Sequence, residues 1–90
     1  MKIEQLYLFK EAVKYNSVSA AAEKNFMSQS SVSSSIINLE KELGTELLRR
    51  SNAGVSPTIT GELLLKKAEE ILKAIDDITE TVSYTHLTLP

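Results

Sequence analysis

The sequence contains no cysteine and only one histidine, His86. Disulfides, thiolate metal ligands and histidine clusters are therefore excluded, and we expect neither a metal nor a cofactor. No apolar run approaches the ~20 residues of a membrane span, and the first residues lack the pattern of a signal peptide. The chain also lacks a glycine-rich phosphate loop, a His-x-x-x-His pair and a cysteine nucleophile. We therefore expect one small cytoplasmic domain that is not an enzyme.

An excess of positive charge is also missing, because 10 Lys and Arg face 12 Asp and Glu, for a net charge of −2. This balance opposes a nucleic-acid partner, whose proteins are usually basic. The charges are unevenly distributed, however. Residues 1–60 carry seven basic and six acidic residues, whereas residues 61–90 carry three and six. The acidity therefore lies mainly in the last third of the chain.

Apolar spacing predicts two short helices at the start of the chain. Leu6, Phe9 and Val13 step by three and four, which indicates a helix over residues 3–14 with one buried face. The Asn16-Ser17 pair interrupts this pattern, and Ser17 or Ser19 can cap a second helix through residues 20–24. This helix should stop near residues 25–27.

A third helix follows after only about three residues, which is the spacing of a helix-turn-helix. Ser28 is a good N-cap, and Gly44 supplies a C-terminal stop. The inward face is predicted to hold Val32, Ile36, Leu39 and Leu43. The opposite face, which is free to contact a ligand, holds Ser30, Ser34, Ile37, Asn38 and Lys41, with Gln29, Ser31 and Ser33 flanking it.

Residues 47–57 predict a short hairpin, or wing, that turns through residues 51–54 and places Pro57 at a strand end. Thr58 or Thr60 can then cap a long helix. Its apolar residues repeat in steps of four and three, which is a heptad seam made of Leu64, Ala68, Ile71, Ile75, Ile78 and Val82. Residues 83–90 have a strand-like composition and read as either a linker start or a non-native tail.

Six motifs occur in series: Leu6-x-x-Phe9, Ser17-x-x-x-Ala21-Ala22-Glu23, Ser28-Gln29-x-x-Val32-Ser33, Leu39-Glu40-x-x-Leu43-Gly44, Leu47-x-x-Arg50 and Thr58-x-x-Gly61. In order and spacing they resemble the N-terminal domain of LysR-type transcriptional regulators over residues 1–82. The resemblance implies a mostly α fold, a winged helix-turn-helix over residues 1–58 followed by a linker and dimerisation helix over residues 59–82.

The resemblance also implies a function, namely sequence-specific binding of a homodimer to a palindromic double-stranded DNA site. Members of the family continue into a larger effector-binding domain, which 90 residues cannot hold. We therefore expect no inducer to bind this fragment. The family usually has a buried Leu where Asn25 stands, and we expect Phe26 to fill that space.

Candidate DNA contacts are drawn from the third helix, residues 29–43, and from the wing. Base contacts are expected from Gln29, Ser30, Ser33, Ser34 and Ile37, with Gln29 first because its amide can bond bidentately to adenine. Ile37 either touches a thymine methyl group or packs against a neighbour. Backbone contacts are expected from Ser28, Ser31, Lys24, Lys41, Arg49 and Arg50.

Two questions remain open at this level. Arg49 and Arg50 occupy adjacent strand positions and so point to opposite sides, one toward a phosphate while the other braces the wing. The acidic balance and the alanine at the wing tip, Ala53, favour an alternative function as a helical dimerisation or protein-interaction module with little DNA affinity.

Overall fold

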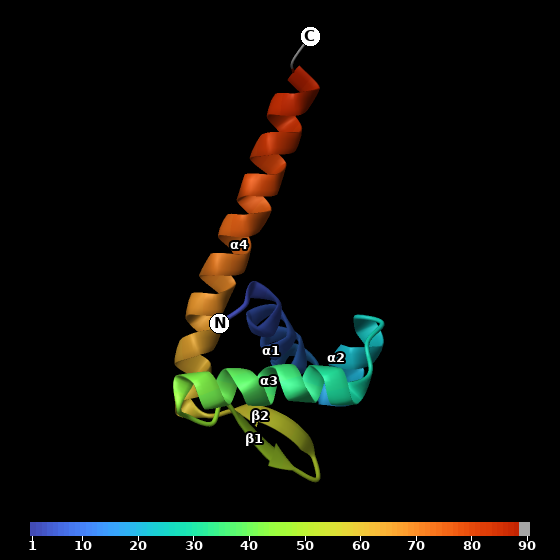
Figure 1. Ribbon diagram of the computed structural model, residues 1–90, viewed down its shortest axis with the longest axis vertical. Helices are drawn as coiled ribbons and strands as arrows, with labels where there is room; N and C mark the ends of the chain where they lie inside the picture. The colour runs from blue at the N-terminus through green and yellow to red at the C-terminus, as the bar shows by residue number, and fades with distance from the viewer. Residues whose placement is uncertain (89–90) are drawn as a thin grey trace.

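The computed structural model describes the backbone of residues 1–88 and the side chains of residues 1–82. The elements are α1 (Ile3–Tyr15), α2 (Val18–Lys24), α3 (Gln29–Leu43), β1 (Leu48–Ser51), β2 (Gly54–Pro57) and α4 (Ile59–Thr88). The first three helices and the hairpin form a head, from which α4 rises as a long rod (Figure 1). This arrangement confirms the predicted fold, a winged helix-turn-helix followed by a long helix. No helix among the described residues is both long and apolar enough to cross a membrane.

Side-chain caps fix where three of the helices begin. The Ser17 Oγ accepts a hydrogen bond from the Ala20 N–H at 3.0 Å, so Ser17 and not Ser19 caps α2. The Ser28 Oγ accepts from the Ser31 N–H at 3.1 Å and caps α3 as predicted. At the start of α4 the Gly61 N–H donates to Thr58 Oγ1 at 3.0 Å, which identifies Thr58 as the cap.

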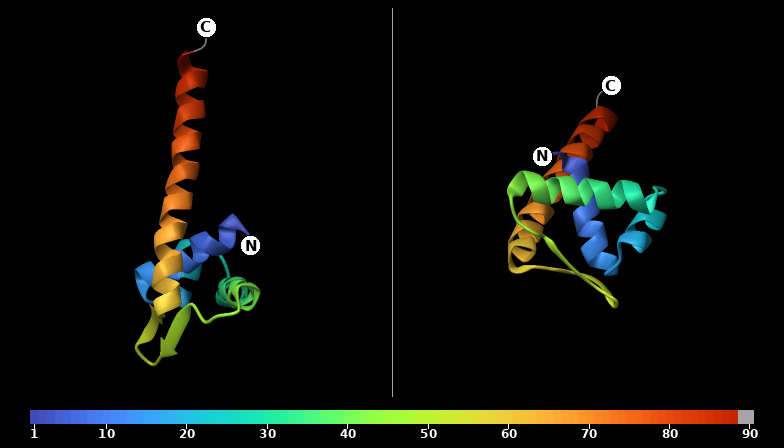
Figure 2. Two further views of the ribbon diagram at one scale, coloured as in Figure 1. Left: turned by 90° about the vertical axis from the view of Figure 1, so that its left-hand side faces the viewer. Right: turned by 60° about the horizontal axis from the view of Figure 1, so that its bottom comes forward.

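The core is centred on α1, which contacts α2, α3, α4 and β2 (Figure 2). Because α1 is covered from several sides, its burial extends beyond the single predicted stripe. Leu8 and Ala12 are buried alongside Leu6 and Phe9, whereas Val13 is only half-buried. The other elements contribute the remaining core side chains: Val18, Ala21, Ala22, Val32, Ile36, Leu39, Leu47, Leu48, Val55 and Ala68.

Two apolar residues predicted to face inward do not. Leu43 is 41% exposed, because the last turn of α3 extends past the neighbours that cover Val32, Ile36 and Leu39. Phe26 is 97% exposed and has a φ of +54°, so its side chain leaves the head instead of filling the space beside Asn25. Asn25 itself is half-buried, and its Nδ2 donates to the Ala21 carbonyl at 2.8 Å.

The hairpin is anchored to the head at its tip and at its base. Near the tip, the Val55 N–H donates to the Asn16 carbonyl at 3.1 Å. A Cβ on Gly54, whose φ is +120°, would lie 2.2 Å from that same carbonyl oxygen, so only glycine fits there. At the base, the Glu40 Oε2 accepts from the N–H groups of Leu47 at 2.7 Å and Leu48 at 3.3 Å. The wing is therefore held by α3 and by the α1–α2 turn together.

The lower part of α4 belongs to the core of its own chain. Ala68, which we predicted at the dimer interface, is 0% exposed because it packs into the hydrophobic cluster around α1. Leu64 packs half-buried against the same cluster. The prediction that Ala68 faces a partner chain is therefore wrong.

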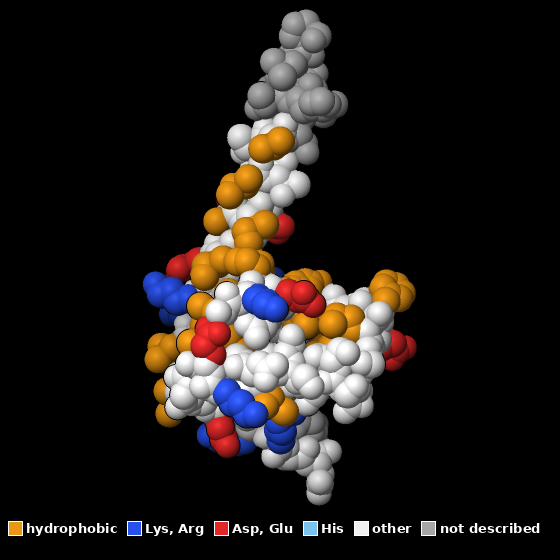
Figure 3. All heavy atoms as spheres, in the orientation of Figure 1, with side chains coloured by type: hydrophobic (Ala, Val, Ile, Leu, Met, Phe, Trp, Pro, Cys, Tyr) orange, Lys and Arg blue, Asp and Glu red, His pale blue; other side chains and the backbone are white. Residues whose placement is uncertain are grey.

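Higher along α4 the seam is uncovered. Ile78 and Val82 are 63% and 62% exposed, Ile71 is exposed, and Ile75 is half-buried. Figure 3 shows hydrophobic side chains continuing along the rod above the head. The backbone stays helical through Thr88, although residues 83–90 have a strand-like composition. Residues 89–90 lie outside the described residues.

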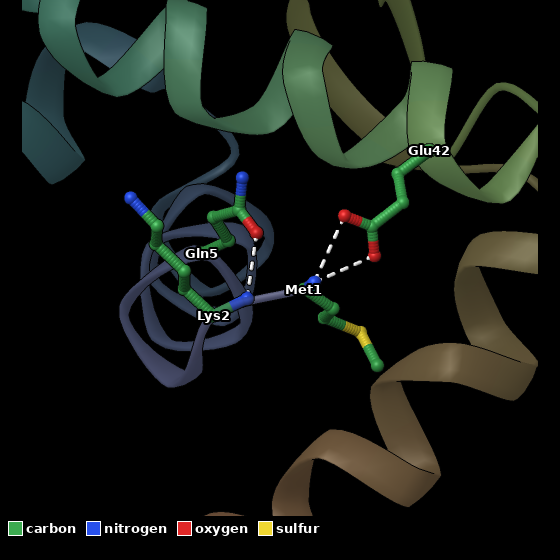
Figure 4. Close-up of polar contacts among 4 residues, drawn as sticks. All are labelled: Met1, Lys2, Gln5 and Glu42. Carbon is green, nitrogen blue, oxygen red and sulfur yellow. Dashed lines mark hydrogen bonds and ion pairs between the residues drawn. The ribbon is translucent and has the colours of Figure 1, made fainter.

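The start of α1 is tied to the end of α3 (Figure 4). The Met1 amino group lies 2.7 Å from the Glu42 Oε2 and 2.8 Å from its Oε1. The Lys2 N–H donates to the Gln5 Oε1 at 2.8 Å, which satisfies one amide at the helix start. The Met1–Glu42 ion pair thus joins the start of α1 to the last turn of α3.

Candidate nucleic-acid interface

The outward face of α3 is polar and uncovered. As the periodicity predicted, this face exposes Ser30, Ser34, Asn38 and Lys41. Ile37 lies among them and is 37% exposed. Gln29 and Ser31 are exposed at the helix start, while Ser33 is half-buried. The helix therefore presents amides and hydroxyls along most of its length, with a positive charge at Lys41.

The hydroxyls at the start of α3 form one hydrogen-bonded group. The Ser28 Oγ lies 2.7 Å from the Ser31 Oγ, to which it donates, and 3.2 Å from the Ser30 Oγ. Since the Ser31 oxygen accepts from Ser28, the Ser31 proton stays available to a ligand. Such a group offers donors to phosphate oxygens or to base edges.

The strand register decides the directions of the two wing arginines. Arg50 pairs with Val55, and Arg49 pairs with Ser56. Residues directly opposite each other across a ladder share a face, and Val55 is buried against the head. Arg50 therefore lies on the side of the hairpin that faces the head, and Arg49 lies on the outer side with Ser56.

Three hollows surround this surface, and they differ in charge. One of ≈ 200 Å³ lies between the start of α2, the start of α3 and the hairpin, and it brings Gln29 and Arg50 together. A second joins Ile37 and Lys41 at the end of α3, and a third includes both Arg49 and Arg50, but carboxylates of Glu40 and Glu46 line both.

Lys24 lines none of these three hollows. Its ammonium is 6.0 Å from the centroid of the Tyr15 ring, on α1.

Prediction from sequence missed several residues at this surface. Asn38 was placed on the outward face without a role, Ser17 and Ser19 were considered only as caps, and nothing marked Glu40 as the brace of the wing. The exposure of Asn38 beside Ser34 was the available signal.

A partly buried polar network joins α1 to the turn between α2 and α3. The Glu11 carboxylate, on a residue that is 8% exposed, accepts from the Tyr7 hydroxyl at 3.2 Å and from Asn25 Nδ2 at 3.3 Å. Burial raises the pKa of Tyr7 above its ordinary value, and the hydrogen bond to Glu11 raises it further. Asn25 therefore serves this network where the resemblance suggested an apolar residue.

The short turn between α2 and α3, the polar outward face of α3 and the hairpin beside it define a winged helix-turn-helix domain. Residues 3–62, two thirds of the chain, match the model of the bacterial regulatory helix-turn-helix proteins of the lysR family. The chain belongs to this family.

Named relatives are transcriptional regulators. The chain is 41% identical over 83 residues to the probable HTH-type transcriptional regulator LrrA of Synechococcus elongatus, a match covering 92% of the chain and 28% of the relative. It is 33% identical over 82 residues to the HTH-type transcriptional regulator TdcA of Escherichia coli, covering 91% and 26%. The chain thus spans about a quarter of the length of these relatives.

Solved structures contain the same arrangement of helices and hairpin as this chain. The crystal structure of the BenM DBD/catB site 1 DNA complex superposes with a TM-score of 0.91 at 30% identity, covering 96% of this chain and 97% of that one. The crystal structure of CbnR, a LysR family transcriptional regulator, superposes with a TM-score of 0.85 at 29% identity, covering 92% and 29%.

Proposed function

We propose that the chain is the sequence-specific, double-stranded-DNA-binding module of a bacterial LysR-type transcriptional regulator, with α3 in the major groove. The observation that carries this proposal is the uncovered polar face of α3, beside a hairpin that is anchored on both sides. An α-helix fits the major groove of DNA, where each base pair presents a distinct set of hydrogen-bond donors and acceptors. Membership of a family of regulators, with DNA complexes among the similar structures, supports the same function. Because the proposed ligand is bacterial DNA, we expect the protein to act in the cytoplasm.

Base contacts are assigned to the part of the face nearest the start of α3. Gln29 reads adenine through its amide, and the hydroxyls of Ser30, Ser33 and Ser34 and the methyl groups of Ile37 add contacts to base edges. Ser33 is half-buried and so reaches less far than the others.

Phosphate contacts surround this region, and each adds a salt-dependent contribution to affinity. They are assigned to Ser28, Ser31, Lys24, Lys41, Arg49 and Arg50. Carboxylates beside Lys41 and Arg49 reduce the positive charge there. A single head is therefore expected to bind weakly, since few unopposed cations face the DNA.

Pairing of two chains through α4 compensates for weak individual heads. The exposed seam of Ile71, Ile78 and Val82, with half-buried Ile75 and Leu64, is the surface assigned to a second copy. At 1.5 Å per residue the 30 residues of α4 extend roughly 45 Å. This length is comparable to the ~34 Å between successive major-groove faces, so two heads can occupy half-sites of a palindrome. Two linked heads bind more tightly than one through effective concentration.

Selection of bound sequences from a random DNA pool tests the proposal. We expect enrichment of a palindromic motif and an affinity that falls steeply with salt, because neutralised phosphates release counterions. A dimer that enriches no sequence and shows no salt dependence would instead identify a dimerisation or protein-interaction module. The second outcome is the alternative that the acidic balance of the chain favours.

A further inference from the structure

The backbone of Leu47 is hydrogen-bonded on one side to α3 and on the other side to the start of α4. Its N–H donates to the Glu40 Oε2 at 2.7 Å, and its carbonyl accepts from the Thr58 N–H at 3.0 Å. The two neighbouring residues repeat this pattern. The Leu48 N–H donates to the same Glu40 oxygen at 3.3 Å, and the Glu46 carbonyl accepts from the Thr58 Oγ1 at 2.6 Å. These three consecutive residues, the α3–α4 bridge, therefore join the two helices.

The first turn of α4 packs directly on this bridge. Figure 2 shows α4 rising from the end of the hairpin, and a single residue, Thr58, separates β2 from α4. Gly61 is buried, and an added Cβ would collide with the Leu47 carbonyl oxygen, so the backbone of α4 lies against the bridge. Further along, Ala68 is fully buried in the core around α1. Because α4 is held at these two points, the bridge and the core together set its direction.

The angle between α4 and α3 decides how far apart two paired heads lie. The middle of the seam assigned to a second copy, near Ile75, lies roughly 26 Å from Thr58 at about 1.5 Å per residue. A change of about 10° in this angle would displace each head by roughly 4 to 5 Å, which exceeds the ~3.4 Å rise of one base pair. A dimer therefore selects one spacing of its half-sites only if the angle is fixed.

We propose that the α3–α4 bridge determines the half-site spacing that the dimer accepts, with Thr58 and Glu40 as positioning residues. This inference rests on the proposed function and deepens it, because it assigns spacing to the bridge and base identity to the outward face of α3. Thr58 acts from α4 through its hydroxyl, and Glu40 acts from α3 through its carboxylate. Both act through the backbone of the bridge and not by contacting DNA.

Three substitutions of Thr58 separate the bridge from helix capping, since the Thr58 Oγ1 also accepts from the Gly61 N–H. Serine keeps both hydrogen bonds, an ionised aspartate keeps the cap but cannot donate to the Glu46 carbonyl, and valine loses both. The readout is the distribution of spacings between paired half-sites in random-pool selection. The unmodified chain and Thr58→Ser should prefer one spacing by about tenfold over its neighbours, because a rigid link loses effective concentration when the span is wrong. Thr58→Asp and Thr58→Val should reduce this preference to about threefold or less and leave the half-site motif unchanged.

Gly61→Ala tests the bridge from the backbone of α4, and Gly44→Ala controls for lost stability. The methyl group added at Gly61 pushes α4 away from Leu47, so the preferred spacing should shift by about one base pair or more. Gly44 has a φ of +72°, where alanine is strained, but nothing lies within 4 Å of its added Cβ. Gly44→Ala should therefore lower the unfolding midpoint without changing the spacing. If Gly61→Ala unfolds, Thr58→Asp provides the test.

Glu40→Ala and Glu46→Ala form a matched pair on the α3 side of the bridge. Both remove a carboxylate that lines the same two hollows, so any electrostatic effect on DNA affinity is common to both variants. Glu40→Ala also releases the amides of Leu47 and Leu48. It should therefore broaden the spacing distribution, whereas Glu46→Ala should leave it sharp. Equal distributions for the two variants would contradict a positioning role for Glu40.

The proposed function and the bridge fail differently in these experiments. A chain that enriches no sequence overturns the proposed function, and the bridge with it. Enrichment of single half-sites overturns pairing through α4, and with it the bridge as the determinant of spacing. Paired half-sites at many spacings in the unmodified chain overturn only the bridge. A sharp spacing that Thr58→Asp and Gly61→Ala both leave unchanged does the same.

Discussion

The head and α4 carry the same kinds of apolar side chain, but they differ in what covers them. In the head, Leu6, Phe9 and Ile36 are enclosed by several elements of the same chain. Along α4, enclosure ends after Ala68, and Ile78 and Val82 remain mostly exposed. One unbroken heptad pattern thus runs through two environments. The comparison teaches that a repeated spacing identifies an apolar face without identifying the partner that covers it.

The largest effect is expected where α4 belongs to the head. Ala68→Glu places a carboxylate in a fully buried position, so it should destabilise the fold by on the order of 4 to 5 kcal/mol or more. Ala74→Glu is the matched control, because the same substitution falls on an exposed position of the same helix. Urea unfolding followed by circular dichroism measures both. Equal midpoints for the two variants would show that Ala68 is not part of the core.

The next effect concerns the uncovered part of the seam. Ile71→Glu with Ile75→Glu should give a monomer by light scattering, with a folded head and reduced affinity for DNA, because two carboxylates then face the partner helix. Lys66→Glu with Lys73→Glu introduces two carboxylates at exposed positions on the opposite side of the helix from the seam and should leave the dimer intact. A seam variant that still sediments as a dimer would move the interface elsewhere.

A smaller effect is expected at the polar face of α3, which is exposed like the seam of α4 but is assigned to DNA. Gln29→Ala should weaken specific binding by on the order of 1 to 3 kcal/mol and relax the preference at one base position. Its unfolding midpoint should not change, since Gln29 is exposed. Random-pool selection with the variant provides the readout. An unchanged motif together with unchanged affinity would remove Gln29 from the interface.

The smallest effect sharpens the comparison within the head itself. Phe26 is exposed and has a φ of +54°, a conformation that costs a bulky residue roughly 1 to 2 kcal/mol. Phe26→Gly should therefore stabilise the head by about 1 kcal/mol, measured by urea unfolding. Asn16→Gly is the control at a similar φ of 53°, where asparagine is already tolerated and the gain should be smaller. A loss of stability on replacing Phe26 would mean that the exposed ring is held by contacts in solution.

Element order and part of the core could be predicted, because helical periodicity and capping residues are local properties of the sequence. Val32, Ile36 and Leu39 follow from spacing alone, and the cap at Ser28 follows from its residue type and position. Thr58 was one of two candidate caps, and the structure selects it over Thr60. Leu43 and Ala68 could not be placed, because their burial depends on where neighbouring elements end. Phe26 failed for a different reason, since the positive φ of a tight turn outweighed the hydrophobicity of its side chain.

The outward face of α3 was predictable for the same periodic reason, but the grouping of residues around it was not. Arg50 and Gln29 are far apart in sequence, and only the hairpin register and its anchoring bring them to one hollow. Glu40 reads as a solvated helix residue until its carboxylate is seen to accept the amides of Leu47 and Leu48. Such long-range contacts depend on tertiary structure and leave no local signal.

The double anchoring of the hairpin limits how the wing can be redesigned. Gly54 has no room for a side chain because the Asn16 carbonyl is too close, and Gly61 is in the same position relative to the Leu47 carbonyl, where a Cβ would lie 2.1 Å from the oxygen. Insertions or longer side chains at these sites would detach the wing from its supports. The exposed turn at Asn52 and Ala53 lies at the far end of the hairpin, beyond these anchors. Residues can therefore be inserted at this turn, to add contacts outside the major groove, without changing the hydrogen bonds that hold the hairpin to the head.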